Sequence, residues 1–318
     1  MTATVRPFRF TTSMPALTTP VQKWRDEIRR IEDLGFSSVA ISDHLTGGWS
    51  MDPVVALTVA AEATSRLRLL TMVLCNDLRH PAVLHRSLAN LDVVSDGRLE
   101  IGLGAGWKEA DYRASGIRFD PPATRIARLA ESVEVIRGLF GPAPLTYRGD
   151  HYQVTGLTGL PRPVQQPRPP LLVGGGGRRV LELAGRVADI VSVAPRLDPH
   201  ADPRAIARRL SGTDLARKIA WVRDAATTAG RDPRSLELQL SILDMSLTHR
   251  GVRHRWTSSL ARGLPTDALA GSPVALHGDL EACVDRLWEL RERYGVSYLH
   301  LGGDLDGAAL IVERLAGR

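Results

Sequence analysis

The sequence predicts an α/β protein, a (β/α)8 barrel with inserted loops and a small β-hairpin. Short apolar runs alternate with amphipathic helical segments, which gives eight strand–helix units along the chain. The runs are continuously apolar, as in parallel strands that are covered on both faces. A length of 318 residues suits one such barrel, and an open doubly wound sheet usually has fewer strands. We therefore expect residues 1–318 to form one TIM-barrel domain.

The boundaries of the units follow from turn and capping signals. The first helical segment places Val21, Trp24, Ile28 and Ile31 on one face and stops at Gly35. The Pro-rich stretch 159–170 is interpreted as a loop, because the alternation resumes directly after it. A hairpin is predicted at 145–154, with Gly149 and Asp150 in its turn. Strands are expected at 8–13, 37–42, 67–75, 98–106, 170–175, 188–195, 236–246 and 296–303. Helices are expected at 21–35, 52–65, 81–97, 122–139, 178–186, 213–230, 279–295 and 305–317.

The composition is that of a globular enzyme. Hydrophobic residues make up 43% and charged residues 24% of the chain, and no run approaches the length of a bilayer span. The N-terminal residues lack the apolar region of a secretory signal, and the two cysteines, Cys75 and Cys283, are expected to be unpaired. We expect a cytoplasmic protein with reduced thiols and no membrane partner.

The positive charge comes almost entirely from arginine. The net charge is +6, and Lys23, Lys108 and Lys218 are the only lysines. A GC-rich genome explains this bias, and an anionic ligand is the functional alternative, because guanidinium groups bind phosphate and carboxylate bidentately. The arginines are spread along the chain and aromatic residues are 5%, so nucleic acid is not an expected partner.

The residues that follow each strand are the candidates for a functional site, because barrel enzymes place their active sites at the carboxyl ends of the strands. Asp43 and His44 follow the second strand, and the sequence Cys75-Asn76-Asp77 follows the third. The fourth strand ends in Gly104-Ala105-Gly106-Trp107, and the fifth in four glycines, 174–177. The basic segment 249–256 is expected to form a loop after the seventh strand. These sets of residues are predicted to meet at one mouth.

The glycine run 174–177 lies between a strand and the start of a helix. Free backbone amides and the helix dipole favour a phosphate there, glycine permits close approach, and Arg178 adds a positive charge. The alternative is a tight turn without a ligand. The run does not match G-x-G-x-x-G, so a Rossmann-type NAD site is not predicted.

His44 has two interpretations. It is either a core histidine bonded to a backbone carbonyl or a residue that transfers protons. A metal centre is not predicted, because no strand end supplies a dense set of His, Asp and Glu, although the chain has nine histidines. The chain has no G-x-S-x-G motif and no local partner that would activate a cysteine, so covalent catalysis is not predicted.

Four segments together resemble the bacterial luciferase-like superfamily, and within it the oxidoreductases that use the deazaflavin coenzyme F420. They are "EDLGFSSVAISDHL", "LRHPAVLHRSLANLDVVSDGRLEIGLGAGWKEADYRASG", "PLLVGGGGRRVLELAGRVADIVS" and "GDLEACVDRLWELRERYGVSYLHLG". The resemblance covers nearly the whole chain. It is specific for the superfamily and less specific for the coenzyme.

The resemblance implies a set of site residues. His44 would transfer the proton, and Asp43 would orient or polarise His44. Both residues would face the cofactor ring. The segment from Met72 to Asn76 would hold the pyrimidine side of the ring and contain a non-prolyl cis peptide bond. The cofactor-binding residues would be Val73, Leu74, Cys75, Asn76, Gly104, Ala105, Gly106, Gly174, Gly175, Gly176, Gly177 and Arg178, the last ones at the phosphate.

The chain departs from the sugar-phosphate dehydrogenases of this branch at two places. Those relatives carry an acid directly after the last glycine of the strand-4 motif, where this chain has Trp107. The nearest acid, Glu109, is therefore included among the candidate catalytic residues. Trp49 stands near the place of a tryptophan that follows Asp-His in these relatives, with different spacing, and Trp49 and Trp107 are expected to contact the substrate. Both departures weaken a sugar-phosphate assignment.

Three functions remain open. The first is an F420-dependent oxidoreductase for a small organic substrate, which reduces a C=C or C=N bond or oxidises an alcohol. The second is an FMN-dependent monooxygenase that is supplied by a flavin reductase; Ala105 favours F420, because the FMN users often carry an arginine in that motif for the phosphate. The third is a barrel that binds flavin or deazaflavin without turnover. A homodimer is left open.

Overall fold

The central sheet closes into a barrel, as predicted. The structure is a computed structural model that describes residues 6–48, 51–196, 202–264 and 266–318. Its largest sheet has the strand order β3-β2-β1-β14-β10-β9-β8-β5-β4, and an additional pairing of β3 with β5 closes the ring. The predicted strand at 67–75 is divided into β3 and β4, so the ring has eight strand positions. Its strands are β1 (Arg9–Ser13), β2 (Ser38–Ile41), β3 (Arg68–Thr71), β4 (Leu74–Cys75), β5 (Leu99–Gly104), β8 (Leu171–Gly175), β9 (Ile190–Val193), β10 (Glu237–Ser241) and β14 (Val296–His300).

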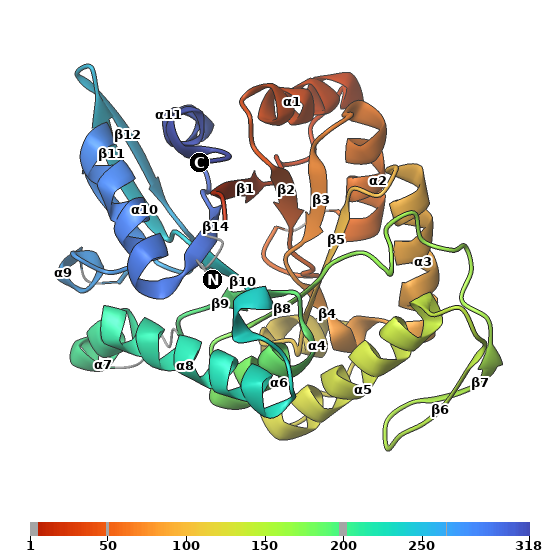
Figure 1. Cartoon of the computed structure of the whole chain (residues 1–318). Coiled ribbons are helices and arrows are strands. Elements are labelled where there is room, and N and C mark those ends of the chain that lie inside the picture. Colours follow the sequence, from red (N-terminus) through yellow and green to blue (C-terminus); the bar gives the residue numbers. More distant parts are fainter. Residues whose placement is uncertain (1–5, 49–50, 197–201, 265) are drawn as a thin grey trace. The chain divides into compact units, whose positions relative to one another are not determined.

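Each of the eight predicted helices is present, with ends that differ by a few residues from those expected. Asp52 caps α2 by accepting from the amides of Val54 and Val55, and Asp279 caps α10 by accepting from Ala282. The helices are α1 (Val21–Asp33), α2 (Pro53–Ala63), α3 (Pro81–Val94), α5 (Pro122–Phe140), α6 (Arg178–Val187), α8 (Gly212–Thr228), α10 (Leu280–Tyr294) and α11 (Leu305–Leu315). Figure 1 labels them along the chain.

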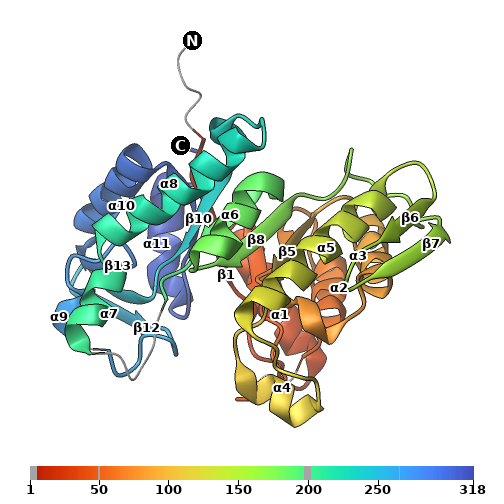
Figure 2. The same ribbon diagram turned by 90° about the horizontal axis from the view of Figure 1, so that it is seen from below.

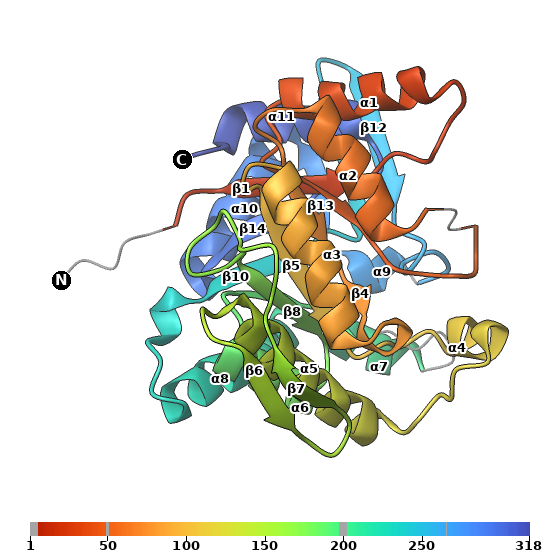
Figure 3. The ribbon, with the colours of Figure 1, turned by 90° about the vertical axis from the view of Figure 1, so that its right-hand side faces the viewer.

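The chain divides into two compact units, which are described separately. Unit 1 contains residues 1–13, 30–39 and 174–318, and unit 2 contains residues 14–29 and 40–173. In unit 2, helix α3 packs against α2 and α5, and the predicted hairpin, β6 (Leu145–Arg148) and β7 (Gln153–Leu157), lies beside α5 (Figure 3). In unit 1, helices α6 and α8 lie side by side (Figure 2).

One predicted strand is too long, and one predicted loop is wrong. The run at 236–246 leaves the barrel after β10. There the Ile242 amide donates to the His300 carbonyl, and the Leu243 amide donates to the Val274 carbonyl. The chain continues as β11 (Asp244–His249) and β12 (Val252–Thr257), a hairpin in the segment expected to be a loop. β11 also pairs with β13 (Ala275–Asp279) in a separate sheet. Continuous apolarity cannot show where a chain changes sheets, and the Arg250-Gly251 turn lacks the usual Asn-Gly signal.

Three short helices and two 3-10 turns were not predicted. They are α4 (Glu109–Ser115), α7 (Pro203–Arg209), α9 (Thr266–Leu269), η1 (Asn76–Leu78) and η2 (Pro233–Ser235). Elements of this length show little apolar periodicity. Helix α4 matters most, because it brings a buried acid to the end of β2. Figures 2 and 3 show it at one edge of unit 2.

Candidate active site

The strongest candidate site lies in unit 2, where the chain leaves β2. His44 stands three residues after the last residue of the strand, and its side chain is mostly buried. Its ring atom Nδ1 is 2.7 Å from Oδ2 of Asp111, the third residue of α4. The Trp107 and His44 rings are nearly perpendicular, with an interplanar angle of 86° and 5.6 Å between the ring centroids. His44 is therefore held by an acid on one side and by an aromatic ring on another.

Asp111 uses both of its carboxylate oxygens. Oδ1 accepts from the amides of Leu45 at 3.2 Å and Thr46 at 2.9 Å, and from the Thr46 hydroxyl at 2.6 Å. Burial by itself would raise the pKa of Asp111. The hydrogen bonds from Thr46 and His44 and the positive charge of Lys108 outweigh it, so the pKa lies below its usual value. The carboxylate next to His44 is thus ionised at neutral pH.

Asp43, the acid that the sequence paired with His44, has other partners. Its Oδ2 accepts from Arg79 at 2.6 Å and from the amide of Cys75 at 3.1 Å. Arg79 also bonds Asp52, the cap of α2. Asp43 therefore fastens the segment after β4 to the end of β2, and the acid that contacts His44 is Asp111.

The segment that follows β3 contains the expected non-prolyl cis peptide bond, between Met72 and Val73. The hydroxyl of Ser42 donates to the carbonyl of Met72 at 3.0 Å. Val73 and Cys75 are half-buried, whereas Leu74 and Asn76 are fully buried. The Asn76 amide donates to the Tyr152 hydroxyl at 3.2 Å, so that side chain contacts the protein interior. Among the predicted residues of this segment, Val73 and Cys75 have accessible surface.

The segment 104–107 is held by Tyr112 and Arg125, neither of which was predicted as a site residue. Tyr112 is buried, and its hydroxyl donates to Asp77 at 3.1 Å and lies 3.4 Å from the Cys75 sulfur. Burial and these neighbours raise its pKa, so the phenol stays protonated. The Arg125 guanidinium donates to the carbonyls of Ala105 and Gly106. These contacts fix the backbone at the end of β5.

The remaining predicted residues are placed as follows. Trp107 is 62% exposed, and Glu109 is exposed on α4, where it pairs with Arg113. In unit 1, glycines 174–177 end β8 and precede α6, and Arg178 pairs with Glu182 one turn along that helix. Trp49 lies outside the described residues. Asp111, which lies two residues after the candidate Glu109, was not identified from the sequence. A helix predicted after Trp107 would have indicated it.

Gly177 shows where a ligand has room. It caps α6 without a side-chain hydrogen bond, and a Cβ added to it would meet no atom within 4 Å. Its φ of −96° is open to any residue, so neither conformation nor packing requires glycine there. The backbone amides at the start of α6 are therefore open to an anion such as a phosphate.

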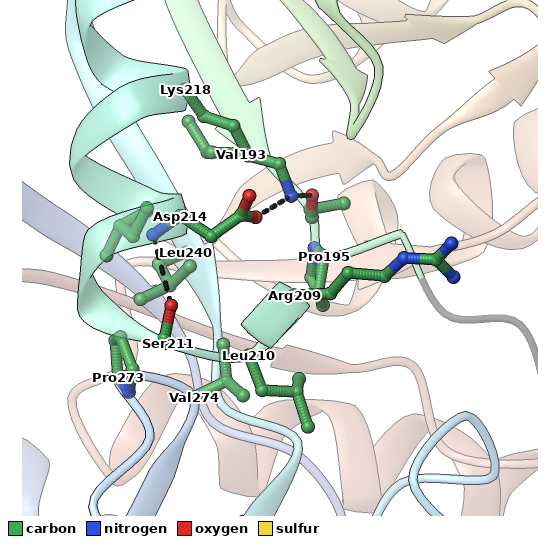
Figure 4. A pocket seen from close by; sticks show the side chains of 12 residues that line it. Val193, Pro195, Arg209, Leu210, Ser211, Asp214, Lys218, Leu240, Pro273 and Val274 are labelled. Atoms are coloured by element: carbon green, nitrogen blue, oxygen red, sulfur yellow. Dashed lines mark hydrogen bonds and ion pairs between the residues drawn. The ribbon is translucent and has the colours of Figure 1, made fainter. Parts of the chain in front are cut away.

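Two other polar features of unit 1 are less suited to catalysis. In a small cleft at the end of β9, Lys218 bonds Asp214 at 2.8 Å and the Ala194 carbonyl at 2.9 Å, while Arg209 points away from that pair (Figure 4). Asp214 thus neutralises the lysine. At the end of β14, buried His300 bonds the Ser13 hydroxyl at 3.0 Å. The described residues include no group of three or more His, Cys, Asp or Glu that could hold a metal.

The comparisons with known proteins concern the family and the fold of the chain. The profile of the luciferase-like monooxygenase family matches residues 3–243. An F420-dependent glucose-6-phosphate dehydrogenase of Kineococcus radiotolerans is 32% identical over 69% of this chain, and the match spans 64% of the relative's own length. An uncharacterized protein of Mycobacterium tuberculosis is 30% identical over 75% of both chains.

Two solved structures share the fold over nearly the whole chain. An F420-dependent secondary alcohol dehydrogenase, solved with an F420–acetone adduct, has a TM-score of 0.76 at 20% identity and covers 97% of this chain and 98% of its own. The monooxygenase RslO1 of Streptomyces bottropensis has a TM-score of 0.74 at 24% identity, with 96% of both chains covered. At these identities the likeness establishes the barrel fold. In the described part of the chain, no helix has the length and apolarity to cross a membrane.

Proposed function

The chain belongs to the luciferase-like monooxygenase family, and we propose that it is an F420-dependent oxidoreductase that transfers a hydride between the deazaflavin and a small organic substrate. The observation that carries this proposal is the partly buried contact of 2.7 Å between His44 and Asp111 at the end of a barrel strand. It provides a proton-transfer group that is already paired with an ionised acid. The relatives named as F420-dependent dehydrogenases support the choice of cofactor.

The residues present fit the proposed cofactor. When bound, F420 supplies a carbon centre that accepts or donates a hydride and does not itself exchange the substrate proton. The half-exposed side chains of Met72 and Val73 offer an apolar surface for a flat ring. The open amides at Gly177, with Arg178 beside them, suit the phosphate. The segments 73–76, 104–106 and 174–178 are accordingly proposed to hold the cofactor.

His44 is proposed to move the proton that accompanies hydride transfer. Oxidation of an alcohol removes a hydride from carbon and a proton from oxygen, and an imidazole is a suitable base near neutral pH. Asp111 stabilises the positive charge that the ring gains. Trp107 is proposed to cover the substrate next to His44, and Glu109, which is exposed and paired with Arg113, is retained as a candidate only at the rim.

Cofactor preference is tested by fluorescence titration with F420 and with FMN, at low and at raised salt. We expect F420 to bind more tightly, because its oligoglutamate tail is anionic and four arginines of unit 1 are exposed: Arg178, Arg250, Arg253 and Arg255. Salt should weaken binding, since exposed ion pairs are screened. Tighter binding of FMN would contradict the proposal.

The type of chemistry is tested with oxygen and with a deuterium label. An F420-dependent hydride transfer should proceed equally well without dioxygen, and deuteride should pass between the reduced cofactor and the substrate. Stoichiometric oxygen uptake would instead establish an FMN-dependent monooxygenase. Binding of either cofactor without turnover of any tested alcohol, imine or enoate would favour a non-catalytic binding barrel.

Three expectations about organisation stay predictions. We propose that residues 1–318 form a single barrel domain, which the continuous ring of strand pairings supports. The homodimer that the sequence leaves open is tested by size-exclusion chromatography with light scattering. Cytoplasmic location is a prediction for cell fractionation.

A further inference from the structure

The position of Asp111 determines which nitrogen of His44 carries the proton. The residue Asp111 is 4% exposed, and its Oδ1 faces three donors from residues 45 and 46, all within 3.2 Å. These donors keep one oxygen in place, so Oδ2 has a fixed position 2.7 Å from His44 Nδ1. An oxygen atom held in this way does not rotate away from the ring.

An ionised carboxylate can only accept hydrogen bonds. Since the pKa of Asp111 is lowered, the proton in its contact with His44 belongs to Nδ1. In a neutral imidazole with a proton on Nδ1, the lone pair is on Nε2.

We propose that Asp111 is the positioning residue of this enzyme: it fixes His44 as the Nδ1–H tautomer, with Nε2 as the atom that exchanges a proton with the substrate. The tautomer follows from the hydrogen-bond geometry and from the ionised state of Asp111, whereas its catalytic consequence rests on the function proposed above. Asp43, the adjacent acid in the sequence, cannot take this role, because its carboxylate bonds Arg79 and the Cys75 amide.

The loop after β2 shows how the fold keeps this contact. Lys108, at the cap of α4, donates to the Thr46 carbonyl at 2.7 Å and lies 3.9 Å from Asp111 Oδ1. The loop 44–46 and α4 are thereby joined at both the carboxylate and the lysine. The loop that carries His44 is therefore fastened to the helix that carries Asp111.

The decisive variant is Asp111→Asn. The three donors at Oδ1 will retain the amide oxygen there, which turns the amide NH2 towards His44 Nδ1. An NH2 group donates, so Nδ1 must become the acceptor and the proton must move to Nε2. The side-chain volume is unchanged, and Asp43→Asn is the matched control, because it removes a buried carboxylate near the same strand end without touching His44.

The tautomer is measured by 15N NMR of histidine-labelled protein without cofactor, with the His44 signals assigned by comparison with His44→Gln. We expect Nδ1–H in the wild type and in Asp43→Asn, and Nε2–H in Asp111→Asn. An Nε2–H tautomer in the wild type would overturn the proposal, and so would an unchanged tautomer in folded Asp111→Asn. If the Asp111→Asn variant does not fold, the tautomer in the wild-type spectrum decides the question by itself.

The kinetic arm follows F420 turnover. We expect Asp111→Asn to lower kcat by about two to four orders of magnitude, the usual range for a misplaced general acid or base, with the cofactor Kd changed less than about twofold. A loss of cofactor affinity with unchanged kcat would overturn the positioning role. If the wild type shows no F420 turnover at all, the proposed function fails while the NMR result stands by itself.

Discussion

Two histidines at the ends of barrel strands behave in opposite ways. His44, after β2 in unit 2, contacts the ionised carboxylate of Asp111. His300, the last residue of β14 in unit 1, is 7% exposed, and the described hydrogen bond of its imidazole ring is to the Ser13 hydroxyl. Burial lowers the pKa of His300 to about 4.

The difference shows what a strand-end position does and does not decide. An acid beside an imidazole stabilises the protonated ring, whereas a buried ring without an acid stays neutral. A carboxylate is thus in place at His44 to stabilise a positive charge on the ring, whereas the lowered pKa of His300 keeps that ring neutral near neutral pH. The residue type and its place in the barrel are shared, and the partner across the fold sets the chemistry.

The largest expected effect is that of His44→Ala on catalysis. We expect the chemical rate with F420 to fall by about two to four orders of magnitude, because the variant lacks the proton-transfer group. The cofactor Kd and the melting temperature should change little. Rapid-mixing kinetics and differential scanning calorimetry measure the two properties.

His300→Gln is the comparison variant, and its rate should remain within about tenfold of the wild type. If His44 has only a structural role, the pattern will reverse: His44→Ala will lose thermal stability and the folded protein will keep its rate.

A substitution at Gly106 should disrupt the packing of Tyr112, a residue of α4. Gly106 has a φ of +73°, and a Cβ added to it would lie 1.9 Å from the hydroxyl oxygen of Tyr112. Tyr112 is the neighbour of Asp111 in the chain. We expect Gly106→Ala to reduce the free energy of unfolding by about 3 kcal/mol or more, from the left-handed backbone and the clash together.

Gly116→Ala is the matched control, because Gly116 has the same φ of +73° and a Cβ there would meet nothing within 4 Å. It should cost about 1 kcal/mol, the backbone penalty alone. Equal losses in thermal or chemical unfolding of the two variants would mean that Tyr112 moves freely and does not hold α4.

The contrast between the histidines also predicts a pH effect on stability. The pKa of His300 is depressed from 6.5 to about 4 in the folded protein, so below pH 6.5 the unfolded chain binds a proton that the folded chain does not. Stability should therefore fall as the pH falls from 7 to 5, by about 2 kcal/mol for this residue.

His300→Gln should remove that part of the loss. Buried His85, whose pKa burial also lowers to about 4, will leave a similar loss in the variant. Unfolding measured in denaturant at pH 7 and pH 5 tests this. An unchanged pH dependence in His300→Gln would show that His300 is protonated or hydrated in the folded state.

The smallest expected effect is that of Trp107. Its ring makes an edge-to-face contact with the His44 ring while 62% of the Trp107 surface is exposed, and such an aromatic pair contributes about 0.5–1.5 kcal/mol. We expect Trp107→Ala to lower kcat/KM by up to about tenfold with no change in melting temperature. Trp107→Phe should retain most of the activity. A larger loss in both variants would mean that the indole also contacts the substrate through its N–H.

The sequence was most informative where periodicity and caps are strong. The eight barrel strands and their long helices were predicted because apolar runs and amphipathic faces repeat along the chain, and the non-prolyl cis bond at Met72–Val73 followed from the family resemblance. The hairpin β11–β12 and the short helix α4 were missed. Whether an apolar run stays in one sheet depends on which strands are available to pair with it, and a seven-residue helix has too few turns to show a period.

By itself, the sequence determined the barrel, the strand ends at which chemistry could occur, and His44 as a candidate. Only the tertiary structure decided that Asp111, 67 residues further along the chain, is the acid that bonds His44, and that the neighbouring Asp43 bonds Arg79 instead. The physical reason is that a hydrogen bond depends on positions within about 3 Å, which adjacency in sequence does not provide. The loop 44–46 and α4 must fold against each other before the carboxylate has a position.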